Sequence, residues 1–73
     1  MPQPSGDIRV SINGRERWVP PGLSVRSLLE RLDLTPELVV VERNREILER
    51  ARLDRVTVEE GDALEVVHFV GGG

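Results

Sequence analysis

The dipeptide Asn13-Gly14 constrains the fold most, because it directly follows a segment with the alternation of a β-strand. Residues 8–12 alternate apolar and polar side chains, which is the period of a half-buried strand. Asn-Gly accepts the positive φ angles of a two-residue turn and is the strongest short-range signal for a β-hairpin. The sequence therefore predicts a hairpin in which residues 15–19 form the second strand.

A two-residue turn also fixes which residues face each other across the hairpin. In this register Val10 faces Arg17, which places an arginine on the core face of the sheet. Trp18 then lies on the outer face, opposite Arg9, where a cation–π contact is possible. The aliphatic part of Arg17 can cover the core edge while its guanidinium reaches water. A β-bulge that shifts the register by one residue is the alternative.

A single amphipathic helix is predicted after the hairpin. Ser24 is a favourable N-cap residue, and the helix should stop near Asp33, before Thr35-Pro36. The apolar residues that follow the cap are spaced i, i+3, i+4 and i+7, so they form one stripe that can pack on a sheet. These residues are Val25, Leu28, Leu29 and Leu32.

The second half of the chain reads as further strands. Residues 38–41 are a continuous apolar run typical of a buried strand, and residues 47–48 suit a very short one. Residues 49–54 are charged and are predicted to be irregular. A turn at 60–62 precedes a final strand over 63–69, in which apolar and acidic residues alternate. One helix must then lie across one face of the sheet to cover it.

Composition excludes several classes of protein. The chain has 73 residues and no cysteine, which fits one domain without disulfides or thiolate chemistry. Its net charge of −3 disfavours DNA and RNA, which need a concentrated basic face. No apolar run approaches the roughly 20 residues of a membrane span, and no signal peptide is recognisable. We therefore expect a cytoplasmic protein that binds neither nucleic acid nor membrane.

The usual catalytic side chains are scarce. The one histidine, His68, lies in a predicted strand, where a structural or solvent-facing role is more common than catalysis. Ser24 is explained as a helix cap. The carboxylates, including Glu59, Glu60 and Asp62, are spread over turns and helix positions, so we interpret them as a solvated surface. No metal site is predicted, because such a site needs several convergent ligands.

The remaining candidate for chemistry is the segment Val70-Gly71-Gly72-Gly73, which follows the final strand directly. Glycine has no Cβ and can enter a slot too narrow for other residues. A glycine-rich end alone is more often an inert, flexible segment. Because this glycine-rich segment directly follows the predicted order of strands and helix, we interpret it as a tail that delivers the terminal carboxylate to another protein. Joining that carboxylate to AMP would let a sulfur nucleophile convert it to a thiocarboxylate.

Several stretches resemble the ThiS family, the sulfur carriers of thiazole formation in thiamine biosynthesis. The most telling are Val41-Glu42-Arg43-Asn44 with Glu46-Ile47, and residues 66–73, Val-Val-His-Phe-Val-Gly-Gly-Gly. The Asn13-Gly14 turn and the helix start also fit, so the resemblance covers about residues 8–73. It implies an α+β fold of the β-grasp (ubiquitin-like) type, with a mixed sheet of four to five strands and one main helix packed across one face. The final strand would be central and parallel to the first.

The resemblance also implies a reaction sequence. A ThiF-like adenylyltransferase would use ATP and magnesium to adenylate Gly73, with Val70, Gly71 and Gly72 in the channel of the enzyme. A cysteine desulfurase or related donor would supply sulfur for the thiocarboxylate. A ThiG-like thiazole synthase would then take that sulfur. The carrier would be a protein co-substrate without catalytic residues or a bound cofactor, not an enzyme.

This interpretation assigns a role to each part of the chain. Residues 1–6 are expected to be a disordered leader, 7–69 the β-grasp domain and 70–73 a flexible glycine tail. Val67 and Phe69 would share one face of the final strand, while the helix covers the other. They are therefore candidates for docking to partner enzymes, although core packing is an equally good explanation of both.

Other functions stay open at this point. Carriers for molybdopterin synthesis or tRNA thiolation also end in Gly-Gly, although they usually lack the Val-Glu-Arg-Asn segment. A ubiquitin-like protein modifier and a non-covalent interaction module are further alternatives. All ten basic residues are arginine, so this protein cannot form chains linked through its own lysines.

Overall fold

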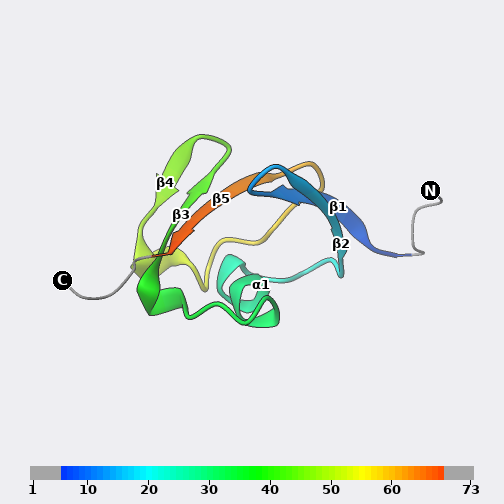
Figure 1. The fold of residues 1–73 in the computed structure, drawn as a ribbon. Helices are drawn as coiled ribbons and strands as arrows, with labels where there is room; N and C mark the ends of the chain where they lie inside the picture. Colours follow the sequence, from blue (N-terminus) through cyan, green and yellow to red (C-terminus); the bar gives the residue numbers. More distant parts are fainter. Residues whose placement is uncertain (1–5, 69–73) are drawn as a thin grey trace.

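The structure, a computed structural model, describes residues 6–68. These residues form a five-stranded sheet that arches over one α-helix (Figure 1). No helix within this range has the length and apolar character needed to cross a membrane. The elements are β1 (Ile8–Ile12), β2 (Arg15–Val19), α1 (Val25–Arg31), a 3₁₀ helix (Pro36–Leu38), β3 (Val39–Arg43), β4 (Glu46–Leu48), a second 3₁₀ helix (Arg50–Arg52) and β5 (Ala63–His68).

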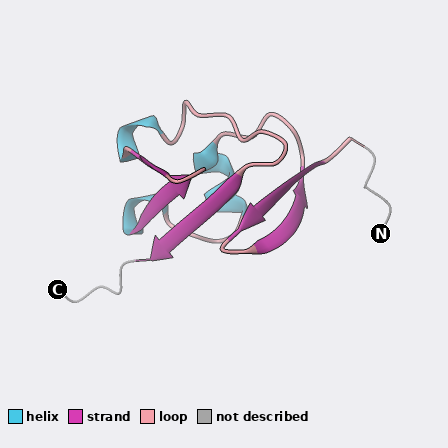
Figure 2. Cartoon of the chain, turned by 90° about the horizontal axis from the view of Figure 1, so that it is seen from above, coloured by secondary structure: helices cyan, strands magenta, loops and turns pink. Residues whose placement is uncertain are grey.

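The strands are ordered β2-β1-β5-β3-β4, so the last strand in sequence is central. Strand β5 runs parallel to β1 and antiparallel to β3, and both hairpins are antiparallel. Figure 2 shows the strand that leads toward the C-terminal end crossing the middle of the sheet. The mixed sheet and the central, parallel position of the final strand are as the resemblance implied.

The hairpin has the register set by a two-residue turn. Val10 faces Arg17 and Arg9 faces Trp18, so the bulge alternative is wrong. Arg17 is exposed although its partner Val10 is buried. Strand β2 is at the edge of the sheet, which lets this long side chain extend into solvent. On the outer face the Arg9 guanidinium forms an ion pair with Glu16, with an Nη1–Oε2 distance of 3.3 Å.

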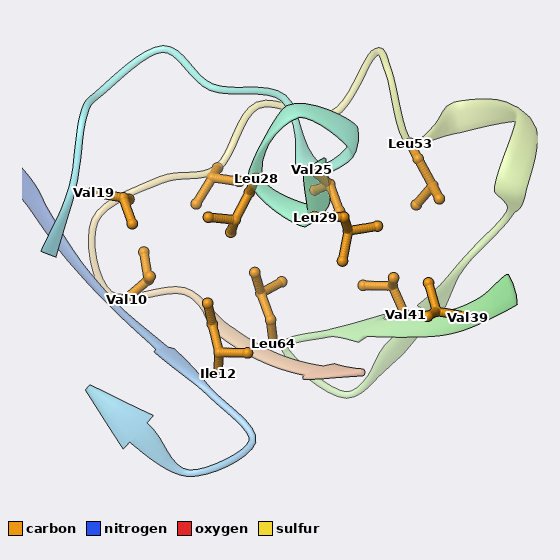
Figure 3. Close-up of a cluster of buried hydrophobic side chains, with 11 residues drawn as sticks. Val10, Ile12, Val19, Val25, Leu28, Leu29, Val39, Val41, Leu53 and Leu64 are labelled. Carbon is orange, nitrogen blue, oxygen red and sulfur yellow. The ribbon is translucent and has the colours of Figure 1, made fainter. Parts of the chain in front are cut away.

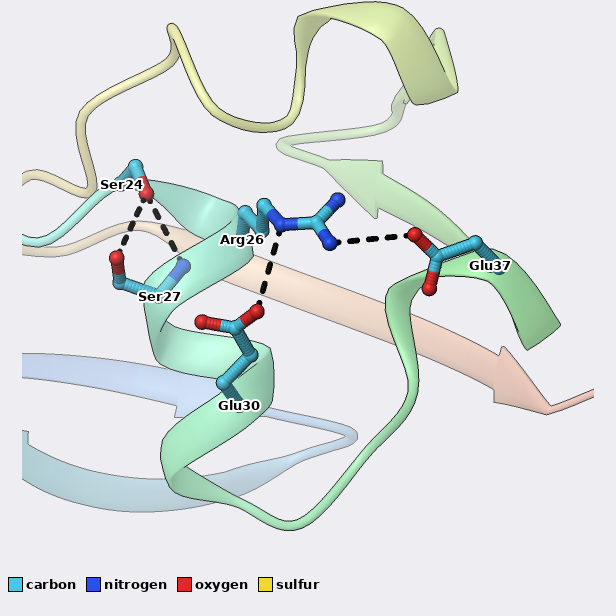
Figure 4. Close-up of polar contacts among 5 residues, drawn as sticks. All are labelled: Ser24, Arg26, Ser27, Glu30 and Glu37. Atoms are coloured by element: carbon cyan, nitrogen blue, oxygen red, sulfur yellow. Dashed lines mark hydrogen bonds and ion pairs between the residues drawn. The ribbon is translucent and has the colours of Figure 1, made fainter.

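Helix α1 starts where the sequence predicts. The Ser24 hydroxyl accepts a hydrogen bond from the Ser27 backbone N–H at 3.0 Å, which is an N-cap contact (Figure 4). Arg26 forms ion pairs with Glu30 at 3.4 Å and Glu37 at 3.2 Å, and so links α1 to the following 3₁₀ helix. The backbone N–H of Glu37 and the Arg26 guanidinium together lower the pKa of the Glu37 carboxyl. These pairs are exposed and contribute little to stability.

The core lies between the sheet and α1, and side chains from both point toward each other (Figure 3). Leu53 belongs to this core, with 2% of its surface exposed, although residues 49–54 were predicted to be charged and irregular. Leu38, expected at the start of a strand, instead ends the first 3₁₀ helix and is exposed. The buried apolar residues are Val10, Ile12, Val19, Val25, Leu28, Leu29, Val39, Val41, Leu53, Val58 and Leu64.

Asp62 is buried, with 5% of its surface exposed, so its assignment to a solvated surface is wrong. Its carboxylate accepts hydrogen bonds from Arg43 Nε at 2.8 Å, Asn44 Nδ2 at 3.0 Å and the Glu59 backbone N–H at 2.8 Å. Burial alone would raise the pKa of Asp62, but these three donors outweigh it and hold the pKa below its ordinary value. The carboxylate therefore ties the β3–β4 turn to the start of β5.

Replacing Asp62 with asparagine is expected to reduce the free energy of unfolding by about 1–3 kcal/mol at pH 7, because buried donors lose an ionised acceptor. Since the folded-state pKa lies below 3.8, the stabilisation is complete above pH 3.8 and is lost as the pH falls through the folded-state pKa. The difference in the free energy of unfolding between wild type and Asp62→Asn should therefore become smaller toward strongly acidic pH.

Urea denaturation at neutral and strongly acidic pH measures this effect. The exposed Asp54 provides the control, because Asp54→Asn should change the free energy of unfolding by less than about 0.5 kcal/mol. If the difference in the free energy of unfolding between wild type and Asp62→Asn were the same at neutral and at strongly acidic pH, the stabilisation would not come from ionisation of the Asp62 carboxylate.

Candidate functional site

The predicted tail follows strand β5, which the structure describes as far as His68. His68 itself is exposed, in line with a solvent-facing role. The residues predicted to carry the chemistry and part of the docking lie outside the described range, and their roles stay predictions. They are Phe69, Val70, Gly71, Gly72 and Gly73.

Strand β5 holds the chain in the sheet up to the last described residue. On one side β3 pairs with it, and Val39 lies opposite His68 while Val40 lies opposite Val67. On the other side β1 runs parallel and pairs Ile12 with Leu64. The strand that precedes the candidate tail is therefore central in the sheet, with β1 beside its first half and β3 along almost its whole length.

The side chain of Asn13 adds hydrogen bonds to β5 on the side where β1 lies. Its Oδ1 accepts a hydrogen bond from the Val66 N–H at 2.7 Å, and its Nδ2 donates to the Val66 carbonyl at 3.2 Å. The Asn13 backbone N–H donates to the Leu64 carbonyl at 2.8 Å. The sequence identified Asn13 only as a turn residue, because a contact across 53 positions leaves no local signal.

The sheet face away from α1 carries exposed apolar side chains. Val67 is 62% exposed there, which fits its predicted orientation, while Leu64 on the opposite face is buried. The pairing places the half-buried Val40 beside Val67 on this outer face, and Ile47 of β4 lies on it opposite Glu42. We call Val40, Ile47 and Val67 the outer apolar patch. Sequence reasoning missed Ile47, which is 69% exposed, because it assigned only a short strand there.

Two acidic residues border the outer apolar patch. Glu42 and Glu65 lie directly opposite each other on β3 and β5. Like charges in this position destabilise a sheet slightly. A partner surface with an apolar centre and basic groups at its edge would therefore complement this face.

The described part of the chain offers few groups for catalysis. Within residues 6–68, no group of three or more histidine or acidic side chains could hold a metal ion. Asp62, whose pKa is shifted, is engaged with Arg43 and Asn44 inside the structure. What this part provides is a stable sheet, an exposed apolar patch and the strand that leads to the predicted tail.

Comparison with known sequences identifies relatives across nearly the whole chain. The model of the ThiS family matches residues 8–73. The sulfur carrier protein ThiS of Bacillus subtilis is 37% identical over 65 residues, which are 88% of this chain and 98% of that protein. Thiazole synthases of Paramagnetospirillum magneticum and Magnetococcus marinus are 41% and 38% identical over 66 residues, 90% of this chain. The chain spans only 20% of the length of each thiazole synthase.

Solved structures are similar in fold. The crystal structure of the thiamine biosynthesis protein ThiS from Geobacter metallireducens aligns with a TM-score of 0.76 and 40% identity. The alignment covers 90% of this chain and 100% of that one. A designed protein based on human erythrocytic ubiquitin has a TM-score of 0.52 at 21% identity, a likeness in fold alone. The expected β-grasp fold is confirmed, and the chain belongs to the ThiS family.

Proposed function

We propose that this protein is a sulfur carrier of thiamine biosynthesis and that the carboxyl group of Gly73 carries the sulfur. The observation on which this rests most is the match to the ThiS family, which runs through residue 73 and includes all three glycines. Strand β5 supports the proposal, since it leads from the centre of the sheet toward these glycines. The protein acts as a co-substrate, and partner enzymes supply the catalytic groups.

The proposed chemistry converts the terminal carboxylate in three steps. A carboxylate oxygen of Gly73 attacks the α-phosphorus of ATP, and pyrophosphate leaves to give an acyl-adenylate. A persulfide from the sulfur donor then attacks the carbonyl carbon, and AMP leaves to give an acyl disulfide. A second thiol attacks the donor-side sulfur of this disulfide, so the S–S bond breaks, the thiocarboxylate of Gly73 leaves and a disulfide forms between the two thiols. The enzyme that binds ATP also binds magnesium, which neutralises phosphate charge. The absence of side chains on the last three residues suits entry into a narrow active site.

Three partners follow from this chemistry: a ThiF-like adenylyltransferase, a cysteine desulfurase or related sulfur donor, and a ThiG-like thiazole synthase. The third is supported by the comparisons, because a segment similar to this chain forms part of two proteins named thiazole synthase. We place the carrier in the cytoplasm, where ATP is available and where a chain without cysteine needs no oxidising conditions.

Intact-mass measurement tests this function directly. The purified chain is incubated with the adenylyltransferase, ATP, magnesium and the sulfur donor. We expect the mass increase of one sulfur-for-oxygen exchange, located at Gly73 by fragmentation. The thiocarboxylate is then offered separately to thiazole synthase, molybdopterin synthase and a tRNA-thiolation enzyme. An unchanged mass, or sulfur transfer only to one of the latter two, would refute the thiazole assignment.

Docking by Val67 of the outer apolar patch and by Phe69, which follows β5 in sequence, gives a separate prediction. Val67→Ala and Phe69→Ala should each raise the KM for the carrier in adenylation by about tenfold, since a buried anchor at an interface contributes more than about 1 kcal/mol. Arg31→Ala, an exposed change on α1, is the control and should leave the KM unchanged. If Phe69→Ala folds normally, is adenylated like wild type and delivers its sulfur like wild type, Phe69 has no part in docking.

A further inference from the structure

The amide side chain of Asn13 takes the place of a strand residue beside β5. Strand β1 ends at Ile12, yet Val66 still has both backbone groups bonded on this side, through Oδ1 and Nδ2 of Asn13. An asparagine amide offers one acceptor and two donors, so it can reproduce the pair of bonds that a neighbouring peptide would make. The ladder on the β1 side of β5 therefore extends one step beyond the end of β1.

Among the described residues, the bonds from Asn13 are the last hydrogen bonds on this side of β5. Peptide groups of successive strand residues point to opposite sides. Because the Val66 groups point toward Asn13, those of Val67 point toward β3, and those of His68 point again to the β1 side. There the chain has already turned away at Gly14. After Val66, the strand is held mainly by its pairing with β3.

We propose that Asn13 is a positioning residue for the tail: its two bonds to Val66 fix the direction of β5 at its described end, His68, from which the chain continues in sequence to Gly73. The proposal rests on the proposed function, because a set direction matters only if a partner enzyme takes up the tail. When the described end of β5 has a fixed direction, less conformational freedom is lost as the enzyme binds the chain that follows it. The contact therefore favours capture of the carrier and leaves the chemical step to the enzyme.

The structure contains a matched control at the other end of β5. Asn44 also begins a turn with a positive φ, 50° against 52° for Asn13. Its Oδ1 accepts from the Ala63 N–H at 2.9 Å and its Nδ2 donates to Asp62 at 3.0 Å. Asn44 thus also uses its side-chain amide to bind the chain where β5 begins, through one backbone N–H and the Asp62 carboxylate, far along the strand from the tail. Glycine at either position keeps the turn conformation and removes the side-chain bonds.

The test varies the carrier concentration in adenylation by the ThiF-like enzyme. For Asn13→Gly we expect the KM to rise roughly fivefold to tenfold, the equivalent of two modest hydrogen bonds, with kcat within about twofold of wild type. Asn13→Asp keeps the acceptor for the Val66 N–H, so its KM should lie between those of wild type and Asn13→Gly. Asn44→Gly should lower stability at least as much as Asn13→Gly and leave the KM within about twofold of wild type.

Backbone ¹⁵N relaxation of the free proteins provides a second measurement that needs no enzyme. The order parameter of His68 should fall in Asn13→Gly and stay at the wild-type value in Asn44→Gly. The inference is overturned if His68 keeps its order in Asn13→Gly, or if both glycine variants raise the KM in proportion to their loss of stability. A wild-type chain that is never adenylated refutes the proposed function instead, and the relaxation result still decides whether Asn13 sets the direction of the strand.

Discussion

Removing Gly72 and Gly73 is expected to reduce thiocarboxylate formation by more than about 100-fold while the fold remains intact. An extended chain advances about 3.5 Å per residue, so the truncated terminus stops about 7 Å short of the reacting position. Reacting atoms must approach to about 3–3.5 Å, and a misplacement of 1 Å can already cost about 100-fold in rate. The shortened chain still ends in a glycine carboxylate, so the variant tests reach and not chemical identity.

Intact-mass kinetics with the adenylyltransferase and sulfur donor measure this loss. A variant that lacks Met1 and Pro2 is the control, because it removes two residues at the other end of the chain and should react like wild type. Circular dichroism and thermal denaturation should show both variants folded, since the core lies within residues 10–64. Normal sulfur delivery by the truncated chain would refute the assignment of Gly73 as the modification site.

The features that sequence predicted well are those controlled by neighbouring residues. A two-residue Asn13-Gly14 turn leaves one register for the hairpin, and the structure has that register. Ser24 was predicted as a helix cap because its side chain needs a partner only three residues away, and it makes that contact. The central place of β5 was different, since periodicity predicts strands but not their order. That order came from the resemblance to a family.

The features that sequence missed depend on residues far apart in the chain. Asp62 follows a turn glycine and reads as a surface residue, but folding brings Arg43 and Asn44 against its carboxylate across 18–19 positions. Leu53 stands alone among charged residues, so no periodic pattern marked it as part of the core. The Asn13–Val66 contact has the same origin. The surroundings of Asp62, Leu53 and Asn13 therefore exist only once the chain has folded.

For the candidate site, the sequence pointed to Gly73 as the reacting residue but did not show which strands and surfaces lie beside the segment that leads to it. Gly73 was chosen because the rest of the chain offers few reactive groups, and it remains a prediction outside the described residues. The structure adds the strand that carries the tail, the exposed Val67 and the patch with Val40 and Ile47. None of these follows from the glycines alone, because they depend on which strands lie beside β5.

Leu64→Ala is expected to have the largest effect on stability, because Leu64 is 2% exposed in the central strand and packs against the core below α1. Such a truncation typically costs about 2–5 kcal/mol, since it removes apolar contacts and leaves a cavity. A chain of this size has a total stability of roughly 4–11 kcal/mol. The melting temperature should therefore fall by roughly 10–30 °C, and part of the protein should be unfolded at 37 °C.

Val67→Ala is the matched variant, three positions along the same strand but on the outer face, where the side chain is 62% exposed. Its free energy of unfolding should change by less than about 0.5 kcal/mol, because solvent already surrounds the side chain. Urea denaturation of both variants measures the difference. Leu64→Ala should lose sulfur transfer only in proportion to its unfolded fraction, whereas Val67→Ala should stay folded and bind the adenylyltransferase less tightly. Equal destabilisation by both changes would contradict the assignment of Val67 to an exposed face and remove the basis for docking through the outer apolar patch.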